Sequence, residues 1–342
     1  MKKFKVGVIG CGRISPTHLV SISQNEDCEL VAVCDNKPER AEAAAKKYGC
    51  KAFTDYKDLI NNPEIDVIHL CTPHYLHPIM AIEAMEAKKH VMTEKPMSIT
   101  YEDAVKMCET AEKNNVTLGV IFQNRFNAGS QTIKKAIETG ELGKIYAGKL
   151  ELTWKRTDEY YSQSDWKGTW DKEGGGVVID QSIHTMDLLN WFINDEIEYV
   201  DADIANRAHE LIKVEDCASG VIKYKNGIVT SFHAMNYYTY DAPVRLELHC
   251  ENGIATMLKD RAEIRYNDGR TVIVENDPRE LVDYGEGVKK YWGNSHKKQI
   301  TDFYNALKEG RQPKISGREA LKTQKFICAI YESGKTRKRV MF

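Results

Sequence analysis

The chain has 342 residues, more than a single hydrophobic core usually holds, so we expect two domains. Its 48 basic and 50 acidic residues nearly cancel, to a net charge of -2. This balance excludes the strongly basic surface that collects nucleic acid or anionic membranes, and it favours a small-molecule ligand. There is no signal-peptide pattern and no apolar run of membrane-spanning length. We therefore expect a cytoplasmic protein with no nucleic-acid or membrane partner.

The nine cysteines include no Cys-x-x-Cys pair. Cys11, Cys34 and Cys71 lie in apolar strand-like runs or at their ends, where a reduced thiol packs as a small hydrophobic group. We expect free thiols rather than disulfides.

Short β-branched runs alternate with helical stretches from residue 4 to about residue 121. This rhythm is typical of the βαβ units of a doubly wound parallel sheet. Thr100 followed by Asp103 resembles a capping box and predicts the start of one helix. Strands are expected at 4–9, 29–34, 66–71, 89–94 and 117–122, and the helices between them end near 25, 47, 87 and 113.

After Gln123 the pattern changes to that of an antiparallel sheet. Strand candidates between 196 and 275 are separated by dipeptides that tolerate the positive φ of hairpin turns: Asn226-Gly227, Asn252-Gly253 and Asp268-Gly269. Polar and apolar residues alternate along 244–249, which indicates one packed face and one face that is polar or paired with another subunit. Helices are expected near 295–309 and 317–332.

The sequence thus predicts an α/β protein with two domains. Residues 1–122 should form a Rossmann domain with a doubly wound parallel sheet. Residues 123–342 should form an α+β domain with a large, mostly antiparallel open sheet, and we expect this domain to bind substrate.

The first strand runs into a variant of the dinucleotide-binding pattern G-x-G-x-x-G, with Gly10, Gly12 and Ser15 in the three glycine positions. The two glycines permit a tight turn and the close approach of a pyrophosphate to a helix N-terminus, and Ser15 is small enough for helix–sheet packing. Asp35 ends the second strand, where its carboxylate can accept hydrogen bonds from the adenosine ribose. A glycine turn with no ligand is the alternative.

The charge of Asp35 favours NAD over NADP, because it would repel a 2′-phosphate. Lys37 and Arg40 keep NADP possible, since either could turn toward that phosphate. The predicted cofactor contacts lie in the glycine turn and at later strand ends: Gly10, Gly12, Arg13, Ile14, Asp35, Arg40, Thr72, His77, Glu94 and Lys95.

Three further motifs occur in a fixed order. Residues 71–77 (CTPHYLH) and 94–96 (EKP) each follow a strand, and the glycine run 174–176 precedes Asp180 and His184. Together with the glycine turn, they resemble the Gfo/Idh/MocA oxidoreductase family, named for glucose-fructose oxidoreductase and inositol dehydrogenase. The resemblance covers essentially the whole chain. It implies a Rossmann domain followed by an open-sheet domain, and often a homodimer or homotetramer formed through that sheet.

The resemblance implies that Lys95 is catalytic. Ligands of an open parallel sheet bind beyond the carboxyl ends of its strands, where Thr72, His77 and Lys95 are expected. An ammonium group there can hydrogen-bond the reacting oxygen and lower the pKa of the alcohol. The alternative is a surface lysine held by Glu94.

Asp180 and His184 stand four residues apart on an expected helix, so they should share a face. The carboxylate can hold the imidazole in one tautomer, while His184 takes the alcohol proton as general base. The resemblance implies the same acid/base role for the histidine. The alternative is a capping aspartate and a buried structural histidine.

Aromatic and basic residues precede the glycine run and suit a sugar, which offers C–H faces and hydroxyl rims. Tyr160 and Trp170 fit packing equally well, and Arg125 with Arg156 could hold a carboxylate or phosphate. The expected substrate residues are Arg125, Arg156, Tyr161, Trp166, Asp180 and His184. The remaining histidines, among them His69, His90, His209 and His249, are expected in strands or at the surface, and no spacing predicts a metal site.

The predicted function is that of an NAD(P)-dependent dehydrogenase or reductase. It would exchange a hydride between nicotinamide and a secondary alcohol or ketone carbon of a sugar, an inositol-like polyol or a sugar derivative. Two alternatives remain: a non-catalytic dinucleotide-binding sensor of the same fold, and a dehydrogenase of a non-sugar diol.

Overall fold

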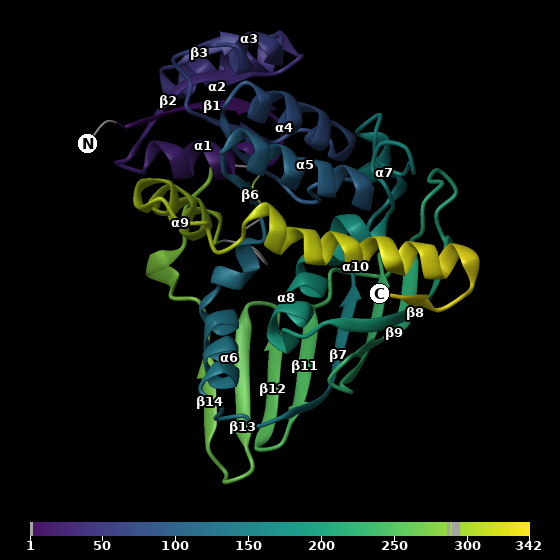
Figure 1. Cartoon of the computed structure of the whole chain (residues 1–342). Coiled ribbons are helices and arrows are strands. Elements are labelled where there is room, and N and C mark those ends of the chain that lie inside the picture. The colour runs from purple at the N-terminus through teal and green to yellow at the C-terminus, as the bar shows by residue number, and fades with distance from the viewer. Residues whose placement is uncertain (1–2, 286–287, 289–294) are drawn as a thin grey trace. The chain divides into compact units, whose positions relative to one another are not determined.

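Six parallel strands form the first sheet. The computed structural model describes residues 3–285, 288 and 295–342. The strand order β3-β2-β1-β4-β5-β6 reverses direction between β1 and β4, so the predicted doubly wound sheet is confirmed (Figure 1). The strands are β1 Phe4–Ile9, β2 Cys28–Cys34, β3 Lys51–Phe53, β4 Val67–Leu70, β5 His90–Thr93 and β6 Leu118–Val120. The helices among them are α1 Ser15–Ser23, α2 Pro38–Tyr48, α3 Tyr56–Ile60, α4 His77–Glu86 and α5 Tyr101–Asn114, with a 3₁₀ turn at His74–Leu76.

The chain divides into two compact units. The first contains the chain up to Gln123 and, among later described residues, 282–285, 288 and 295–322. The second contains Asn124–Leu281 and Thr323–Phe342. Helix α10, Gly317–Thr336, therefore begins in the first unit and ends in the second.

Helix α9, His296–Glu309, belongs to the first unit, so the prediction of an uninterrupted second domain from 123 to 342 was wrong at this point. Its residues Ile300, Phe303 and Tyr304 are completely buried in the same hydrophobic cluster as Val6 and Val8 of β1. The spacing of these three residues gives α9 one apolar face. The sequence contains that face, but no local signal says which sheet it covers.

Nine strands form the sheet of the second unit, in the order β14-β13-β12-β11-β7-β10-β9-β8-β15. Strands β10 and β7 run parallel and their other pairings are antiparallel, which confirms the predicted mostly antiparallel sheet. The strands are β7 Ile145–Thr153, β8 Ile197–Ala205, β9 Cys217–Tyr224, β10 Val229–Met235, β11 Arg245–Cys250, β12 Gly253–Leu258, β13 Arg261–Tyr266, β14 Thr271–Val274 and β15 Val340–Met341. The helical segments are η2 Gln123–Phe126, α6 Ala128–Glu138, α7 Asp158–Ser162, η3 Val177–Ser182, α8 Ile183–Ile193 and η4 Pro278–Glu280.

The three predicted hairpin turns join consecutive strands of this sheet. Gly227 and Gly269 adopt φ values of 92° and 90°, the conformation for which glycine was expected at these turns. Helix α6 packs against β12, β13 and β14, and α8 packs against β7 (Figure 1). The opposite face carries the alternating side chains of Arg245, Glu247 and His249.

Two smaller predictions are also confirmed. The amide of Asp103 donates to Thr100 Oγ1 over 3.2 Å at the start of α5, as expected for a capping box. All nine cysteines are free thiols, five buried and four partly buried. Among the described residues, no helix combines the length and apolar character needed to cross a bilayer.

Candidate functional site

The glycine turn after β1 contains two glycines, and a different physical reason explains glycine at each position. Gly10 has φ +94°, and a Cβ there would lie 2.4 Å from the carbonyl oxygen of Cys71. The fold itself therefore requires Gly10. A Cβ on Gly12 would meet no atom within 4 Å, so the chain leaves open space where a pyrophosphate would approach.

Helix α1 follows this turn with no side-chain cap at its N-terminus, where Ile14 is the capping residue and Arg13 is exposed. The N–H of Ser15 donates to the carbonyl of Gly12 over 3.3 Å, that of Thr17 donates to the carbonyl of Ile14 over 3.0 Å, and Pro16 has none. The positive end of the helix dipole still favours an anion beside Gly12. The Ser15 hydroxyl donates to the carbonyl of Gly12 over 2.8 Å, and its side chain is buried. A serine in the third glycine position thus stabilises the turn through a buried hydrogen bond to its backbone.

Asp35 is held at the end of β2 beside the glycine turn. Its two carboxylate oxygens accept backbone N–H groups of Cys11, over 2.8 Å, and Lys37, over 2.9 Å. An ionised carboxylate has further acceptor sites, so ribose hydroxyls can still bind it. Arg40 is exposed in the first part of α2.

Thr72 and His77 follow β4 and differ in what they offer a ligand. The Thr72 hydroxyl is buried and makes no hydrogen bond to the described residues, so it is available to a bound cofactor. The imidazole of His77 is fully buried, with Nδ1 2.7 Å from the carbonyl of Pro96 and Nε2 2.8 Å from that of Thr72. His77 therefore links two loops of the site rather than facing a ligand. With the open space at Gly12, the orphan hydroxyl fits a bound dinucleotide.

Glu94 points into the protein and meets two histidines. Its Oε1 lies 3.0 Å from His18 Nε2 and 3.3 Å from His296 Nε2. Burial by itself would raise the pKa of Glu94, but these hydrogen bonds outweigh it and hold the pKa well below its usual value. Oε2 accepts the backbone N–H of Lys95 over 3.2 Å, so the buried carboxylate fixes the peptide of a proposed catalytic residue.

The hydrogen-bonded chain continues through two further buried residues. His18 Nδ1 lies 2.8 Å from His69 Nδ1, and His69 Nε2 lies 2.8 Å from the hydroxyl of Tyr304. Burial lowers the pKa of both imidazoles. With both neutral, one direction fits: Tyr304 donates to His69, which donates to His18. His18 then donates to Glu94. His69 lies in β4, as the sequence predicts, and its buried imidazole links Tyr304 to His18.

In the glycine run of the second unit, other groups pack so closely against the backbone that no side chain fits. A Cβ on Gly175 would lie 2.0 Å from the Tyr331 hydroxyl, and one on Gly176 would lie 1.9 Å from the carbonyl of Glu215. The buried carboxylate of Glu215 accepts the N–H groups of Gly176, over 2.9 Å, and Val178, over 3.0 Å. Burial raises the pKa of Glu215 to about 7 although these bonds oppose it. The run therefore anchors the segment that follows.

Asp180 lies in a π-helical segment, η3, instead of the regular α-helix expected from the sequence. Such segments are often found at functional sites. Its Oδ2 accepts hydrogen bonds from Lys167 Nζ over 2.8 Å, from the Tyr160 hydroxyl over 2.8 Å and from Gln181 Nε2 over 2.6 Å. His184 is partly buried in the first turn of α8. Its hydrogen bond with Asp180 stays a prediction.

Two expected substrate residues have structural partners. The guanidinium of Arg125 forms a bidentate pair with Asp187, over 2.7 Å on both oxygens, and both side chains are buried. Tyr161 is buried with Ile212 and Val214, and its hydroxyl accepts from Asn236 over 2.7 Å. The structure therefore ties both side chains into the core of the second unit, and their contact with substrate stays a prediction.

Arg156 and Trp166 remain candidates. Arg156 Nη1 pairs with Asp241 over 2.9 Å, and its guanidinium lies over the rings of Trp154 and Tyr160. Trp166 is partly buried, with the Lys167 ammonium 4.9 Å from its ring centroid.

His209 was expected at a strand or the surface and instead holds the segment that carries Arg156. It is buried, with Nδ1 3.0 Å from Asp216 and Nε2 2.8 Å from the carbonyl of Arg156. The hydrogen bond to Asp216 raises the pKa of His209.

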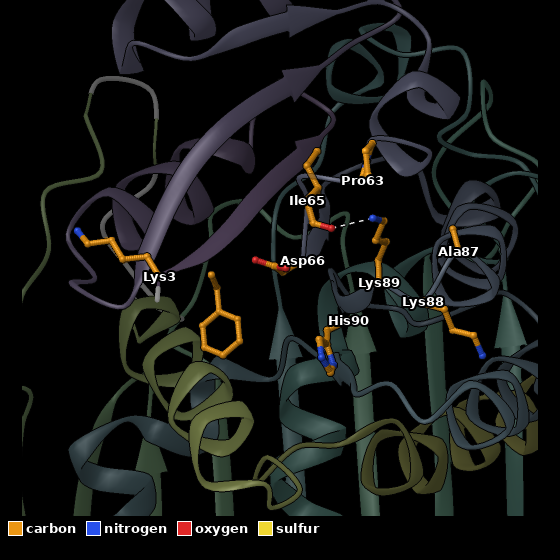
Figure 2. A pocket seen from close by; sticks show the side chains of 9 residues that line it. Lys3, Pro63, Ile65, Asp66, Ala87, Lys88, Lys89 and His90 are labelled. Carbon is orange, nitrogen blue, oxygen red and sulfur yellow. Dashed lines mark hydrogen bonds between the residues drawn. The ribbon is translucent and has the colours of Figure 1, made fainter. Parts of the chain in front are cut away.

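A hollow of about 450 Å³ lies at the opposite edge of the first sheet, at the amino ends of β1, β4 and β5. Figure 2 shows that the Lys89 side chain points to Ile65, whose carbonyl accepts its ammonium over 2.8 Å. Ligands of parallel sheets bind at the carboxyl edge, so this hollow is not the dinucleotide site.

Replacing Gly12 with Val should separate binding from folding. Because a side chain there meets no protein atom, the melting temperature of the apo protein should change by no more than about 2 °C. NAD binding should weaken at least about tenfold, since the side chain fills the pyrophosphate space. The matched variant Gly10→Ala should lower the melting temperature itself. Calorimetric titration and thermal unfolding measure both, and unchanged NAD affinity in Gly12→Val would contradict the assignment.

Replacing Glu173 with Gln should flatten the pH dependence of stability. Burial raises the pKa of Glu173 from the ordinary 4.5 to about 8. The folded state then keeps a proton that the unfolded state releases, so this contribution is complete below about pH 4.5 and is lost as the pH rises through about 8. From about pH 5 to about pH 8, wild type should lose up to about 1 kcal/mol per pH unit relative to the variant. Chemical unfolding at stepped pH measures this, and parallel curves would show that Glu173 is ionised.

Comparison with known proteins agrees with this geometry. Residues 4–122 match the model of an oxidoreductase family with an NAD-binding Rossmann fold, and residues 130–256 match the GFO/IDH/MocA C-terminal domain. The chain is 28% identical over 323 residues to the myo-inositol 2-dehydrogenase of Thermotoga maritima, covering 92% of this chain and 91% of that protein. It is 28% identical over 359 residues to the D-glucoside 3-dehydrogenase of Escherichia coli, covering 98% and 97%.

A solved structure of the WlbA dehydrogenase from Bordetella pertussis, in complex with NADH and UDP-GlcNAcA, superposes with a TM-score of 0.87. It is 31% identical in sequence, and the match covers 100% of this chain and 98% of that chain. The two family models together span most of the chain, and the protein therefore belongs to the GFO/IDH/MocA family of NAD-binding oxidoreductases.

Proposed function

We propose that this protein is an NAD-dependent dehydrogenase that interconverts a secondary alcohol and a ketone on a sugar or sugar-like polyol. The observation that carries the proposal is the position of Lys95. It follows β5 at the carboxyl edge of the parallel sheet, the edge that also presents the open turn at Gly12 and the orphan hydroxyl of Thr72. An ammonium group at that edge suits a reacting alcohol oxygen.

The proposed chemistry assigns one task to each residue. The Lys95 ammonium hydrogen-bonds the reacting oxygen and stabilises its developing negative charge. His184 removes the hydroxyl proton as the C–O double bond forms, and Asp180 stabilises the resulting imidazolium. The hydrogen on carbon leaves as hydride, for which bound nicotinamide is the acceptor. Reduction of the ketone returns the same proton and hydride in reverse.

For the substrate, we propose a sugar that carries an anionic group, with nucleotide-linked uronic acids tested first. The support is the likeness to a WlbA dehydrogenase solved with UDP-GlcNAcA, together with the cation of Arg156 beside Trp154 and Tyr160. Aromatic rings can stack on the apolar faces of sugars, and a guanidinium can pair with a carboxylate. Inositols are the second class, because of the myo-inositol 2-dehydrogenase relative.

We expect NAD to bind more tightly than NADP. Asp35 is buried and fixed by two backbone N–H groups, so its charge cannot swing away from a 2′-phosphate. The exposed Arg40 can offset part of that repulsion. We further propose that the enzyme works in the cytoplasm, where its nine free cysteines would stay reduced.

The catalytic assignment predicts a specific split between binding and turnover. Lys95→Met and His184→Ala should each lower kcat by about 10²–10⁴, while the thermal shift with NAD stays as in wild type in His184→Ala and is reduced but still present in Lys95→Met. The measurement is NADH formation over a panel of UDP-glucuronic acid, UDP-GlcNAcA, inositols and aldoses, repeated with NADP. Lys106→Met, an exposed lysine on α5, is the matched control and should keep wild-type activity. Equal rates in all four proteins would remove the assigned roles. NAD binding with no turnover of any substrate would favour a non-catalytic dinucleotide-binding sensor. Turnover of a non-sugar diol, assayed beside the panel, with no turnover of any panel sugar would favour a dehydrogenase of non-sugar diols.

We also propose that the protein forms a homodimer or homotetramer through the outer face of the nine-stranded sheet. Ile254, Leu258 and Ile273 are 39%, 40% and 53% exposed on this face, among charged side chains. A partner sheet would bury them.

Ile254→Asp should therefore lower the mass measured by light scattering to that of a monomer, because it places a charge among the exposed apolar side chains of this face. Ile79→Asp, on α4 of the first unit and 49% exposed, should leave the mass of the assembly unchanged. A wild-type monomer would end this proposal.

A further inference from the structure

Lys167 is a cation enclosed beside the carboxylate proposed to act with His184. Its ammonium lies 2.8 Å from Asp180 Oδ2 and 2.5 Å from the Tyr160 hydroxyl. The rings of Tyr160 and Trp166 lie 4.5 Å and 4.9 Å from it. Only 15% of its side chain is exposed. A charge with so little water must be compensated by its neighbours, so Lys167 and Asp180 depend on each other.

A second carboxylate competes for the same ammonium. Glu173 is completely buried, and its Oε1 lies 3.6 Å from Lys167 Nζ, which is longer than the 2.8 Å contact to Asp180. One ammonium cannot neutralise two carboxylates in a buried site, and like charges there disfavour a second ionisation. The shorter contact and the added Tyr160 hydrogen bond select Asp180 as the charged member.

We propose that Lys167 is a positioning residue that fixes the negative charge of this cluster on Asp180 and keeps it off Glu173. The inference rests on the proposed function, because it concerns how Asp180 supports His184. It adds a residue to that reaction without assigning Lys167 any contact with substrate or cofactor.

The protonation pattern of the cluster agrees with this placement. Burial and then Asp180 raise the pKa of Glu173 to about 8, so its carboxyl keeps a proton near neutral pH. Burial raises the pKa of Tyr160 to about 12, so its hydroxyl stays a donor. The net result is one ammonium and one carboxylate in direct contact.

The other titratable groups around the cluster do not supply an equivalent cation. Arg156 lies over the Tyr160 ring, 5.2 Å from its centroid, and pairs with Asp241. Glu215 faces Glu173, and Tyr161 packs edge-on against Tyr160. His184 follows on α8 and is the group whose charge changes during turnover in the proposed reaction. Loss of Lys167 would therefore leave Asp180 and Glu173 to share their charge without an ammonium.

Removal of Lys167 should therefore change the pH dependence of kcat. An ionised Asp180 stabilises the imidazolium formed when His184 takes the alcohol proton. Without Lys167, protonation of Asp180 at higher pH removes that stabilisation. The acid limb of the kcat profile should move to higher pH, and KM should change little because Lys167 is not assigned to the substrate.

The test compares Lys167→Met with Lys167→Arg, which keeps the charge, and with Lys172→Met, a lysine of the same segment that contacts only the carbonyl of Asp165 among the described partners. One readout needs no substrate. In protein labelled with ¹³C at aspartate Cγ, the Asp180 signal is assigned from Asp180→Asn. Its titration midpoint should rise by about one to three pH units in Lys167→Met and by less than one in Lys167→Arg.

The second readout is the pH profile of kcat on whichever panel sugar wild type turns over. We expect kcat to fall about tenfold to a hundredfold in Lys167→Met at neutral pH and to recover partly at high pH, with recovery at all pH values in Lys167→Arg. An unshifted Asp180 titration in a folded Lys167→Met protein would overturn the inference. So would a kcat loss that is equal at every pH. If wild type turns over no sugar, the proposed function fails, and the NMR titration still decides whether Lys167 sets the charge of Asp180.

Discussion

Buried carboxylates that accept backbone N–H groups are the interaction on which this protein's functional loops depend. Taking a carboxylate out of water costs several kcal/mol unless hydrogen bonds replace the lost hydration. Asp35, Glu94 and Glu215 are all buried, and each obtains part of that replacement from the main chain. The amides they bind belong to Cys11, Lys95 and Gly176 in turn. The loops are therefore held in place through their main chain.

The two units satisfy the remaining acceptor sites differently. Glu94 is completed by His296 and by His18, the last imidazole of a hydrogen-bonded chain that begins at Tyr304, so the carboxylate stays charged inside the first unit. Glu173 keeps a proton near neutral pH instead, because it is buried and because Asp180 takes the nearby ammonium. A neutral imidazole such as that of His18 stabilises a carboxylate only by donating a hydrogen bond, whereas an ammonium group also determines which of two nearby acids is ionised. The first arrangement suits a carboxylate that holds a loop in place. The second suits a carboxylate that must stabilise a neighbouring group when the charge of that group changes.

The sequence predicted those structural features that depend on residues close together in the chain. Five strands of the first sheet, the hairpin turns of the second and the glycine turn at Gly10 follow from periodicity and turn chemistry within a few residues. Strands β3, β7 and β15 were not predicted. The sequence did not predict the assignment of α9 to the first unit, because an apolar helix face is compatible with either sheet. The partner of Arg125 was not predicted either, because Asp187 lies 62 residues away and no spacing rule links them. The π-helical turn at Asp180 was also missed, since it depends on how Glu215 and Tyr331 pack on the glycine run.

Lys167 is a residue whose proposed role in function cannot be recognised from local sequence pattern. The residues with recognisable chemistry, such as Lys95 and His184, lie in motifs that a sequence can display. The group that sets the charge of Asp180 lies 13 residues before it, between Trp166 and Gly168, in a segment whose only visible feature is its aromatic content. Folding brings the ammonium to the carboxylate because Gly168 donates its N–H to Glu173, which fixes the peptide that follows Lys167. Proteins with the same catalytic motif can therefore differ in the pH at which they work when the residue at this position differs, because the charge state of the acid beside the base depends on a contact outside the motif.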